Sequence, residues 1–278
     1  MAGFTDYNDL VQELTVNGKY LTWDFFKVAP ANAQGAGNWQ TLWKATGTPG
    51  AGADPAAGSA SVNSGGTAHT NEAGSINFAD QSPDTKHILS LGACANQNCT
   101  LLLLDRLVGV SGLSLASTGN KNVNNVALPR YSGSSAAVVS AWLEITTATT
   151  TTPAVVSLNT YTNEAGTASR VGGTITFPAA ATVLHTMLKL PIQAGDKGIR
   201  TVETLNVGTA ASVGAATLLL CRELARIPLI ANQWNEKDFV LQTTALPRVF
   251  DGSSLSLAIL ASGAVTTTVW GTVQLAFG

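Results

Sequence analysis

Short markers in the first half of the chain recur in the second half in the same order, and this repeat constrains the fold more than any other feature. The markers are TNEAG at 70–74 and 162–166, a His-containing segment at 87–92 and 185–191, TLLLLDRL at 100–107 and TLLLCREL at 217–224, and ALPR at 127–130 and 245–248. A shared order of markers indicates an internal duplication. We place the two copies at 70–161 and 162–278.

Alternation of apolar and small polar residues indicates strands within both copies. In the second copy, Leu255, Leu257, Ile259 and Ala261 alternate with Ser254, Ser256 and Ala258, which puts one set on a core face. A shift of 118 positions maps the apolar set onto Ala137, Val139, Ala141 and Leu143. A shift of 119, which aligns the Gly-Ser-Ser triplets, would exchange the two faces of the strand. We therefore prefer 118 within the strand.

The fold class follows from strand number and spacing. Each copy contains about six apolar or β-branched runs, broken by Gly, Asn, Pro and Ser at short intervals. Hydrophobic residues make up 45% of the 278, enough for a large core. The sequence predicts an all-β protein with two tandem, duplicated β-sandwich or jelly-roll-like domains.

Residues 1–69 are predicted to form an extended N-terminal arm with one short helix and a Gly/Ala-rich linker. Asp6 can cap a helix that Asn17 and Gly18 end, and an apolar strand, YLTWDFFKV, follows at 20–28. Residues 29–69 are too rich in Gly, Ala, Pro and Ser to form a core of their own. Large apolar residues along the arm are predicted interface anchors, docking either on a neighbouring copy or on the chain's own body: Phe4, Trp23, Phe25, Phe26, Trp39 and Trp43.

The second copy contains an additional segment, and we expect a further contact there, around 193–214. ALPR itself is interpreted as a strand-end and turn device, in which Arg130 and Arg248 donate to loop carbonyls. The alternative is that the two arginines bind a ligand carboxylate. Glu72 and Glu164 in TNEAG are interpreted as turn-capping residues rather than as paired catalytic carboxylates.

Residues that would carry catalysis or bind metal do not form a recognisable pattern. His69, His87 and His185 are the only histidines, and we find no Asp, Glu, Cys or His at metal-binding spacing from His87 or His185. The marker order makes His87 and His185 equivalent. No nucleophile elbow, phosphate-binding loop or dinucleotide fingerprint occurs. We expect no enzyme activity, no cofactor and no metal.

The cysteines, the net charge and the apolar runs indicate which partners and which cellular compartment to expect. Cys221 is expected to be a buried apolar residue, and Cys94 and Cys99 to be either a disulfide or, as we prefer, two free thiols. A net charge of −2, without a Lys/Arg cluster, argues against a nucleic-acid partner. No apolar run is long enough to span a membrane, and the first residues do not form a secretory signal, so we expect synthesis in a cytoplasm.

The opening MAGFTDYNDLVQELTVNGKYLTWDFFKVA, then WQTLWKATGTPGAGA, then the LPR-containing repeats resemble a group of mostly uncharacterised virion structural proteins of tailed bacteriophages. The resemblance implies a head-associated capsid decoration or cement protein on the capsid exterior, bridging subunits of the major capsid protein as a homo-oligomer, with a trimer favoured. It does not extend to the major capsid protein, because no segment has the period of a long spine helix.

Two alternatives stay open. One is a head-to-tail connector or tail component. The other is a glycan-binding adhesin or fibre protein, in which Trp142, Trp234 and Trp270 would stack on sugars.

Overall fold

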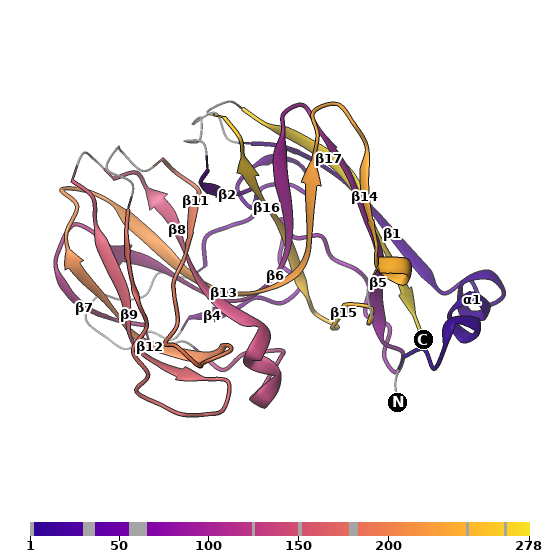
Figure 1. Ribbon diagram of the computed structural model, residues 1–278, viewed down its shortest axis with the longest axis horizontal. Helices are drawn as coiled ribbons and strands as arrows, with labels where there is room; N and C mark the ends of the chain where they lie inside the picture. Colours follow the sequence, from indigo (N-terminus) through magenta and orange to yellow (C-terminus); the bar gives the residue numbers. More distant parts are fainter. Residues whose placement is uncertain are drawn as a thin grey trace.

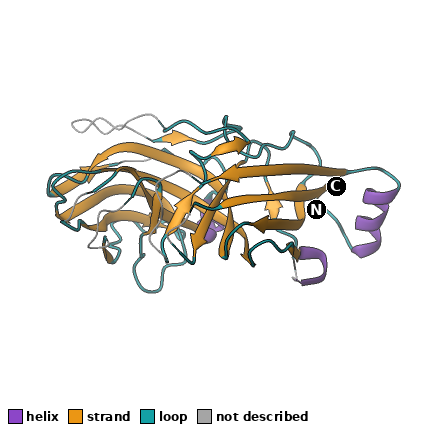
Figure 2. Cartoon of the chain, turned by 90° about the horizontal axis from the view of Figure 1, so that it is seen from above, coloured by secondary structure: helices purple, strands orange, loops and turns teal. Residues whose placement is uncertain are grey.

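Three β-sheets and two short α-helices make up the described part of the chain (Figure 1). A computed structural model describes residues 3–29, 37–55, 66–123, 126–149, 152–177, 183–242, 245–263 and 266–278. The predicted all-β class is confirmed, since strands account for most elements. The molecule is elongated, and α1 projects at one end (Figure 2).

The central sheet closes on itself as a barrel. Because β13 pairs with both β8 and β6, hydrogen bonding runs around a ring of six strands. In ring order the strands are β13 (Ala215–Leu229), β8 (Val139–Thr147), β11 (Thr186–Lys189), β2 (Trp39–Thr41), β16 (Ser254–Ala261) and β6 (Cys99–Ser114). The short β4 (Thr67–Ala68) adds to β6 beyond its pairing with β16.

An open sheet lies on each side of the barrel. Outer sheet 1 has the order β14 (Asn235–Asp238), β5 (Lys86–Ala95), β17 (Thr268–Phe277), β1 (Tyr20–Val28) and β3 (Thr46–Thr48), and β15 (Arg248–Val249) also pairs with β5. Outer sheet 2 has the order β10 (Thr174–Thr176), β9 (Val155–Asn163), β12 (Ile199–Thr209) and β7 (Gly119–Asn122). Outer sheet 1 is at the right of Figure 1 and outer sheet 2 at the left.

Alternating side chains divide the apolar residues among three cores. Leu255, Leu257 and Ile259 pack towards outer sheet 1, and Ala141 and Leu143 pack towards outer sheet 2. Side chains on the opposite faces of these strands point into the barrel. There they form a third cluster, of Leu102, Leu104, Trp142, Met187, Leu219, Cys221 and Ala258. The predicted alternation is thus confirmed. The pairing of β16 with β6 and that of β8 with β13 correspond to an even shift between the two copies, which keeps the same residues on each face as a shift of 118 does.

Strands β6 and β13 each contribute to both outer cores. Leu101 and Leu103 of β6 pack towards outer sheet 1, and further along the same strand Leu107 and Val110 pack towards outer sheet 2. β13 runs antiparallel to β6, so its first half faces outer sheet 2 and its second half outer sheet 1. Strands from 70–161 and 162–278 therefore mix in every sheet, and the predicted boundary does not separate two sets of sheets.

Part of the pairing pattern of outer sheet 1 recurs in outer sheet 2, although outer sheet 1 also contains β3 and β15. β5 pairs with β17 and β14 in outer sheet 1, as β12 pairs with β9 and β7 in outer sheet 2. β11 instead pairs with β8 and β2 in the barrel, so the predicted equivalence of His87, in β5, with His185, just before β11, is wrong. The TNEAG segments also differ in position, one preceding β5 and the other ending β9. The similarity of the His-containing segments and of the TNEAG segments therefore did not identify the strands that are equivalent in the fold.

Part of the predicted arm belongs to the body. The helix is confirmed as α1 (Tyr7–Thr15), with the Asp6 carboxylate accepting from the Asp9 backbone N–H. Strand 20–28 is confirmed as β1, but it lies inside outer sheet 1 between β17 and β3, and β2 completes the barrel. An extended arm is therefore wrong for these strands, because their backbones pair within the chain. Residues 30–36 and 56–65 of the predicted linker lie outside the described residues.

Candidate interaction surface

The barrel interior is filled with side chains. Trp142 is 2% exposed, its ring meets Trp39 edge-on, and its Nε1 donates to Ser140 Oγ at 2.9 Å. The predicted sugar-stacking role is therefore wrong for Trp142, because both faces of β8 are buried. Trp234 and Trp270 lie elsewhere, on the outside of outer sheet 1.

A buried ion pair joins Arg130, which lies between strands, to Asp105 of the barrel strand β6. Arg130 donates from Nε and Nη2 to both carboxylate oxygens of Asp105 at 3.1 and 2.7 Å, and also to the backbone oxygens of His69, Gly252 and Arg106. This confirms the loop-clamping interpretation of the first ALPR. Arg248 in the second copy is exposed and lies over the Phe250 ring at 4.2 Å, so the two arginines have different roles.

A second charged group lies inside the barrel. Arg106 Nη1 approaches Glu144 Oε2 at 3.5 Å and its guanidinium stacks on Trp43 at 4.3 Å. Burial opposes ionisation of Glu144, but His185 and Arg106 outweigh it and hold the pKa of this carboxyl below its ordinary value. With Glu144 and Arg106 each 1% exposed, this arrangement is part of the core.

The segment predicted to be an additional contact, 193–214, is mostly structural. It contains β12, whose backbone pairs on both sides within outer sheet 2. Asp196, before β12, binds Arg170 at 2.9 and 3.0 Å, Asn163 at 2.8 Å and the Tyr161 hydroxyl. The Arg170 guanidinium above all lowers the pKa of Asp196 to about 2. Burial within the chain, rather than a partner, explains most of this segment.

The TNEAG glutamates make local contacts. Glu164 Oε2 accepts from the backbone N–H groups of Lys197 and Gly198 at 3.0 and 3.1 Å, as a turn-capping residue would. Glu72 contacts His69 Nδ1 at 2.5 Å instead. Within the described ranges, no three His, Cys, Asp or Glu side chains gather as metal ligands would.

The three cysteines are buried free thiols, as preferred from the sequence. Burial raises the pKa of Cys99 to about 11 and that of Cys221 to about 12. Neither thiol is therefore activated as a nucleophile.

The predicted interface anchors divide between core and surface. Phe25 and Trp43 are 3% and 1% exposed and pack inside the chain, so for them a role in a free arm is wrong. Trp23 contacts Phe78 and Trp39 contacts Trp142, both within the chain. Phe26 is 47% exposed on β1, and Phe4 lines a pocket. For these two residues an interface role stays a prediction.

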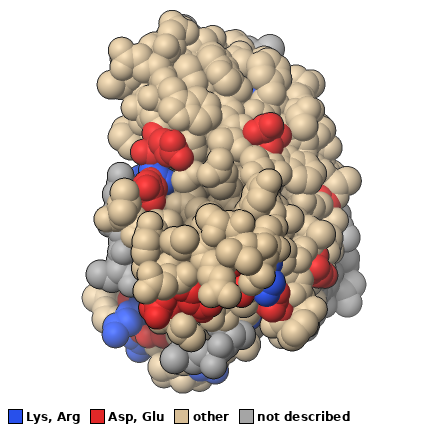
Figure 3. All heavy atoms as spheres, turned by 90° about the vertical axis from the view of Figure 1, so that its right-hand side faces the viewer, with Lys and Arg blue, Asp and Glu red and all other residues tan. Residues whose placement is uncertain are grey.

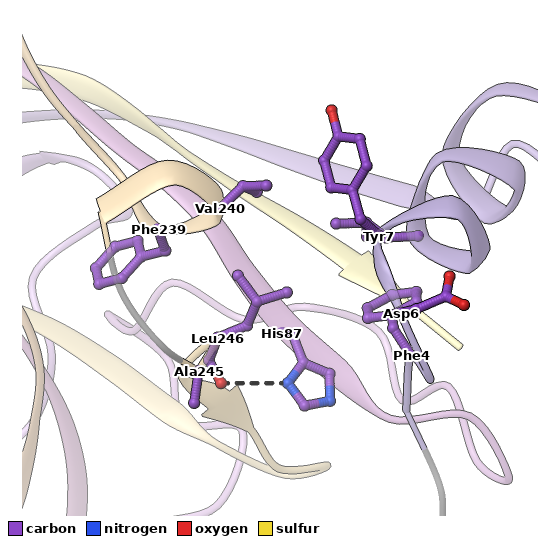
Figure 4. Close-up of a pocket in the computed structure, with 9 residues that line it drawn as sticks. Phe4, Asp6, Tyr7, His87, Phe239, Val240, Ala245 and Leu246 are labelled. Atoms are coloured by element: carbon purple, nitrogen blue, oxygen red, sulfur yellow. Dashed lines mark hydrogen bonds between the residues drawn. The ribbon is translucent and has the colours of Figure 1, made fainter.

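A pocket of about 400 Å³ lies between α1 and the short α2 (Phe239–Gln242). Figure 4 shows Phe4 and Tyr7 on one side, Phe239 and Val240 on the other, and His87 between them. His87 Nδ1 donates to the Leu246 carbonyl at 3.4 Å and Nε2 contacts Thr85 Oγ1 at 3.0 Å. Burial lowers the pKa of His87, so its ring is neutral at pH 7. Apolar side chains make up most of the lining, beside His87 and Asp6, whose carboxylate caps α1.

Exposed apolar side chains lie on or next to the elements that flank this pocket. They are Tyr7 (63% exposed) on α1, Val16 (74%) directly after α1, Tyr20 (60%) at the start of β1 and Leu241 (80%) on α2. Figure 3 shows this end of the molecule as mostly uncharged, with isolated acidic patches and little basic surface. We call the pocket and these residues the helix-end patch. No helix in the described ranges is long and apolar enough to cross a membrane.

Comparison with known proteins gives little further information. No protein-family model matches the chain, and no curated protein matches it. One solved structure, a mutant VP2 protein of infectious bursal disease virus in derived T=1 particles, is 9% identical, with 96% of this chain and 83% of VP2 covered. Its TM-score of 0.16 does not establish a shared fold.

Proposed function

We propose that the chain is a structural component of a bacteriophage particle, a capsid decoration or cement protein that bridges neighbouring subunits of the major capsid protein. The observation that carries the proposal is the helix-end patch, where large apolar side chains 60% to 80% exposed lie on or next to the elements that flank the pocket. Large exposed apolar side chains gathered at one end of a molecule are typical of protein–protein contact. The contact buries apolar surface and requires no chemical step.

The distribution of charge supports a passive role. Arg130, Arg170 and Lys86 are paired with carboxylates inside the fold, where they connect loops to strands. Charged residues make up only 12% of the chain, and a bland surface suits packing against many copies of a partner. Weak single contacts suffice on a capsid, because each is repeated over the lattice.

The proposal is tested by capsid binding of surface variants. The double variant Tyr7→Asp/Leu241→Asp puts two charges into the helix-end patch and should abolish co-sedimentation with capsids that lack the protein. Val171→Asp is the matched control, because Val171 is 56% exposed and lies at the start of the loop to β10 in outer sheet 2. Undiminished capsid binding by the folded double variant would overturn the proposal.

The number of copies per particle distinguishes a decoration protein from a connector or tail component. A decoration protein should be present in hundreds of copies per purified particle, as measured by gel densitometry. A few copies per particle would instead favour the head-to-tail connector or a tail component.

A further inference from the structure

The solvent-facing side of outer sheet 1 contains a row of aromatic residues across adjacent strands. Phe26 of β1 is the register partner of Trp270 of β17, and Trp270 is the partner of Cys94 of β5. Trp234 immediately precedes β14, whose first residue pairs with Ala93, so it continues the row beyond Cys94. Paired residues in a sheet point to the same side. Phe26 and Trp234 are 47% and 53% exposed.

The Trp234 ring lies against the backbone of β5. A Cβ atom at Gly92 would be 2.3 Å from Cζ2 and 2.9 Å from Cε2 of this ring. The ring therefore occupies the space that any side chain at position 92 would fill. Because Trp234 is 53% exposed, the part of its side chain that does not contact β5 is open to solvent.

Two parallel rows beside the aromatic row provide hydrogen-bonding groups. The first runs Asp24, Thr272, Gly92, Glu236, and the second runs Thr22, Gln274, Ser90, Asp238. Ser90 Oγ contacts Gln274 Oε1 at 3.3 Å, which confirms that these side chains share a face. The Thr272 hydroxyl is buried and has no hydrogen-bond partner among the described residues. The rows contain carboxylates, hydroxyls and an amide, and neither lysine nor arginine.

The outer side of outer sheet 2 is different, although the two sheets share part of their pairing pattern. Its residues are small and polar, and they bond to one another: Asn159 Nδ2 donates to Thr204 Oγ1 at 3.1 Å, and Thr160 and Thr204 hydroxyls lie 2.6 Å apart. A solvent-facing sheet in this fold therefore does not require an aromatic row. The aromatic row of outer sheet 1 needs an explanation of its own.

We propose that this face of outer sheet 1 binds a neutral carbohydrate chain. The C–H groups of a sugar ring pack on exposed aromatic rings, and the rings of the row lie on neighbouring strands. The carboxylates of Asp24 and Glu236 accept hydrogen bonds from sugar hydroxyls, with charged acceptors giving the stronger bonds, and the Gln274 amide can also donate. The Asp238 carboxylate is already engaged, because it accepts from two backbone N–H groups of α2. Carboxylates on both edges, without a cation, disfavour nucleic acid and acidic glycans. The site is separate from the helix-end patch and does not depend on the proposed function.

Calorimetric titration of the full chain with maltohexaose, cellohexaose and chitohexaose, at millimolar concentrations, tests this proposal. At least one should bind saturably and change the tryptophan fluorescence. Trp234→Ala should weaken binding roughly tenfold or more, the loss of one stacked ring. Gly92→Ala should weaken it similarly, because the new Cβ displaces the same ring while leaving it present. Val171→Ala is the control, since Val171 is 56% exposed and lies just before β10 of outer sheet 2, away from this face.

Three results would overturn the proposal: no saturable binding of any of the three probes, unchanged affinity in the folded Trp234→Ala variant, or equal loss in Val171→Ala. A fourth would assign the face to a protein contact. If the wild type self-associates in sedimentation velocity, and Trp234→Ala makes it monomeric without any sugar effect, the occupant is a second copy.

Discussion

At the scale of single residues, Arg130 shows that the same short sequence motif, ALPR, has two different structural roles. The same three residues, Ala-Leu-Pro, precede Arg130 and Arg248, yet only Arg130 pairs with a buried carboxylate. Asp105, the carboxylate concerned, is fully buried and lies opposite Arg222 in the pairing of β6 with β13. Because the residue equivalent to Asp105 in the other long strand carries a positive charge, Arg248 has no counterpart for this ion pair.

We predict that Arg130→Met strongly destabilises the fold, because it leaves Asp105 buried without its cation. Removing one partner of a buried ion pair costs about 3 to 5 kcal/mol in the free energy of unfolding. Arg248→Met is the matched control and should change that free energy by less than about 0.5 kcal/mol, as is usual for exposed sites. Urea denaturation of both variants gives the comparison, and equal effects would contradict the assigned roles.

Lys27 predicts a specific dependence of stability on pH. Its side chain is buried on β1 and Nζ donates to the Ala45 and Gly50 carbonyls at 3.2 and 3.1 Å. Burial lowers the pKa of Lys27 to about 8 from 10.5. The folded chain thus holds fewer protons than the unfolded chain between these values, so this residue makes the free energy of unfolding rise with pH, on the order of 3 kcal/mol over the window.

Lys27→Met should remove this contribution, because methionine does not titrate. Urea denaturation at pH 7.5, 8.5, 9.5 and 10.5 in both proteins isolates the effect, since all other groups titrate alike. The expected result is a smaller rise of stability with pH in the variant. Parallel curves would mean that Lys27 keeps its ordinary pKa.

At the scale of elements, some strands depend on a backbone geometry that only glycine adopts. Gly47 in β3 has φ of +132°, and a Cβ there would lie 1.9 Å from the Phe26 carbonyl oxygen of β1. Gly47→Ala should therefore break the pairing of β3 with β1 and lower stability by about 1 to 3 kcal/mol. Gly50→Ala, with no atom within 4 Å of the new Cβ, should be close to neutral by thermal denaturation. Equal melting temperatures in the two variants would contradict this.

Local signals predicted the elements that have their own caps or periods. α1 and β1 lie where the Asp6 cap, the Gly18 stop and the apolar run place them. β2 has only three residues in a Gly-rich setting, and its position comes from pairing with β11 and β16, which are remote in sequence. No short window of the sequence contains that information.

The same limit applies to the candidate surface residues. Alternation shows that β8 and β17 each have two faces, but not whether the second face meets solvent or a barrel interior. Closure of the barrel buries Trp142, whereas the open outer sheet leaves the Trp270 row outside. Trp142 is therefore buried while Trp234 and Trp270 lie on an outer face, because the barrel closes and outer sheet 1 stays open.

At the scale of the whole molecule, β6 and β13 connect the two outer cores into one structure. Each strand is shared along its length between those cores, so melting either core removes support from the other. We predict a single unfolding transition, with tryptophan fluorescence and far-ultraviolet circular dichroism coinciding in urea. Separately expressed 162–278 should not fold, because β13 and β17 would lose β6 and β5. Two resolved transitions, or a folded fragment, would favour independent domains.

The pairing of β1 with β17 sets the order of events on the ribosome. Nine residue pairs join these strands, from Tyr20 with Ala276 to Val28 with Thr268, and all other residues of the barrel and outer sheets lie between them in the chain. At about 5 to 20 residues per second, β1 waits roughly 10 to 50 s for its partner. During that time both faces of β1, with Phe26 on one and Trp23 on the other, are open to chaperones or to aggregation, and outer sheet 1 is completed only after β17 has been synthesised.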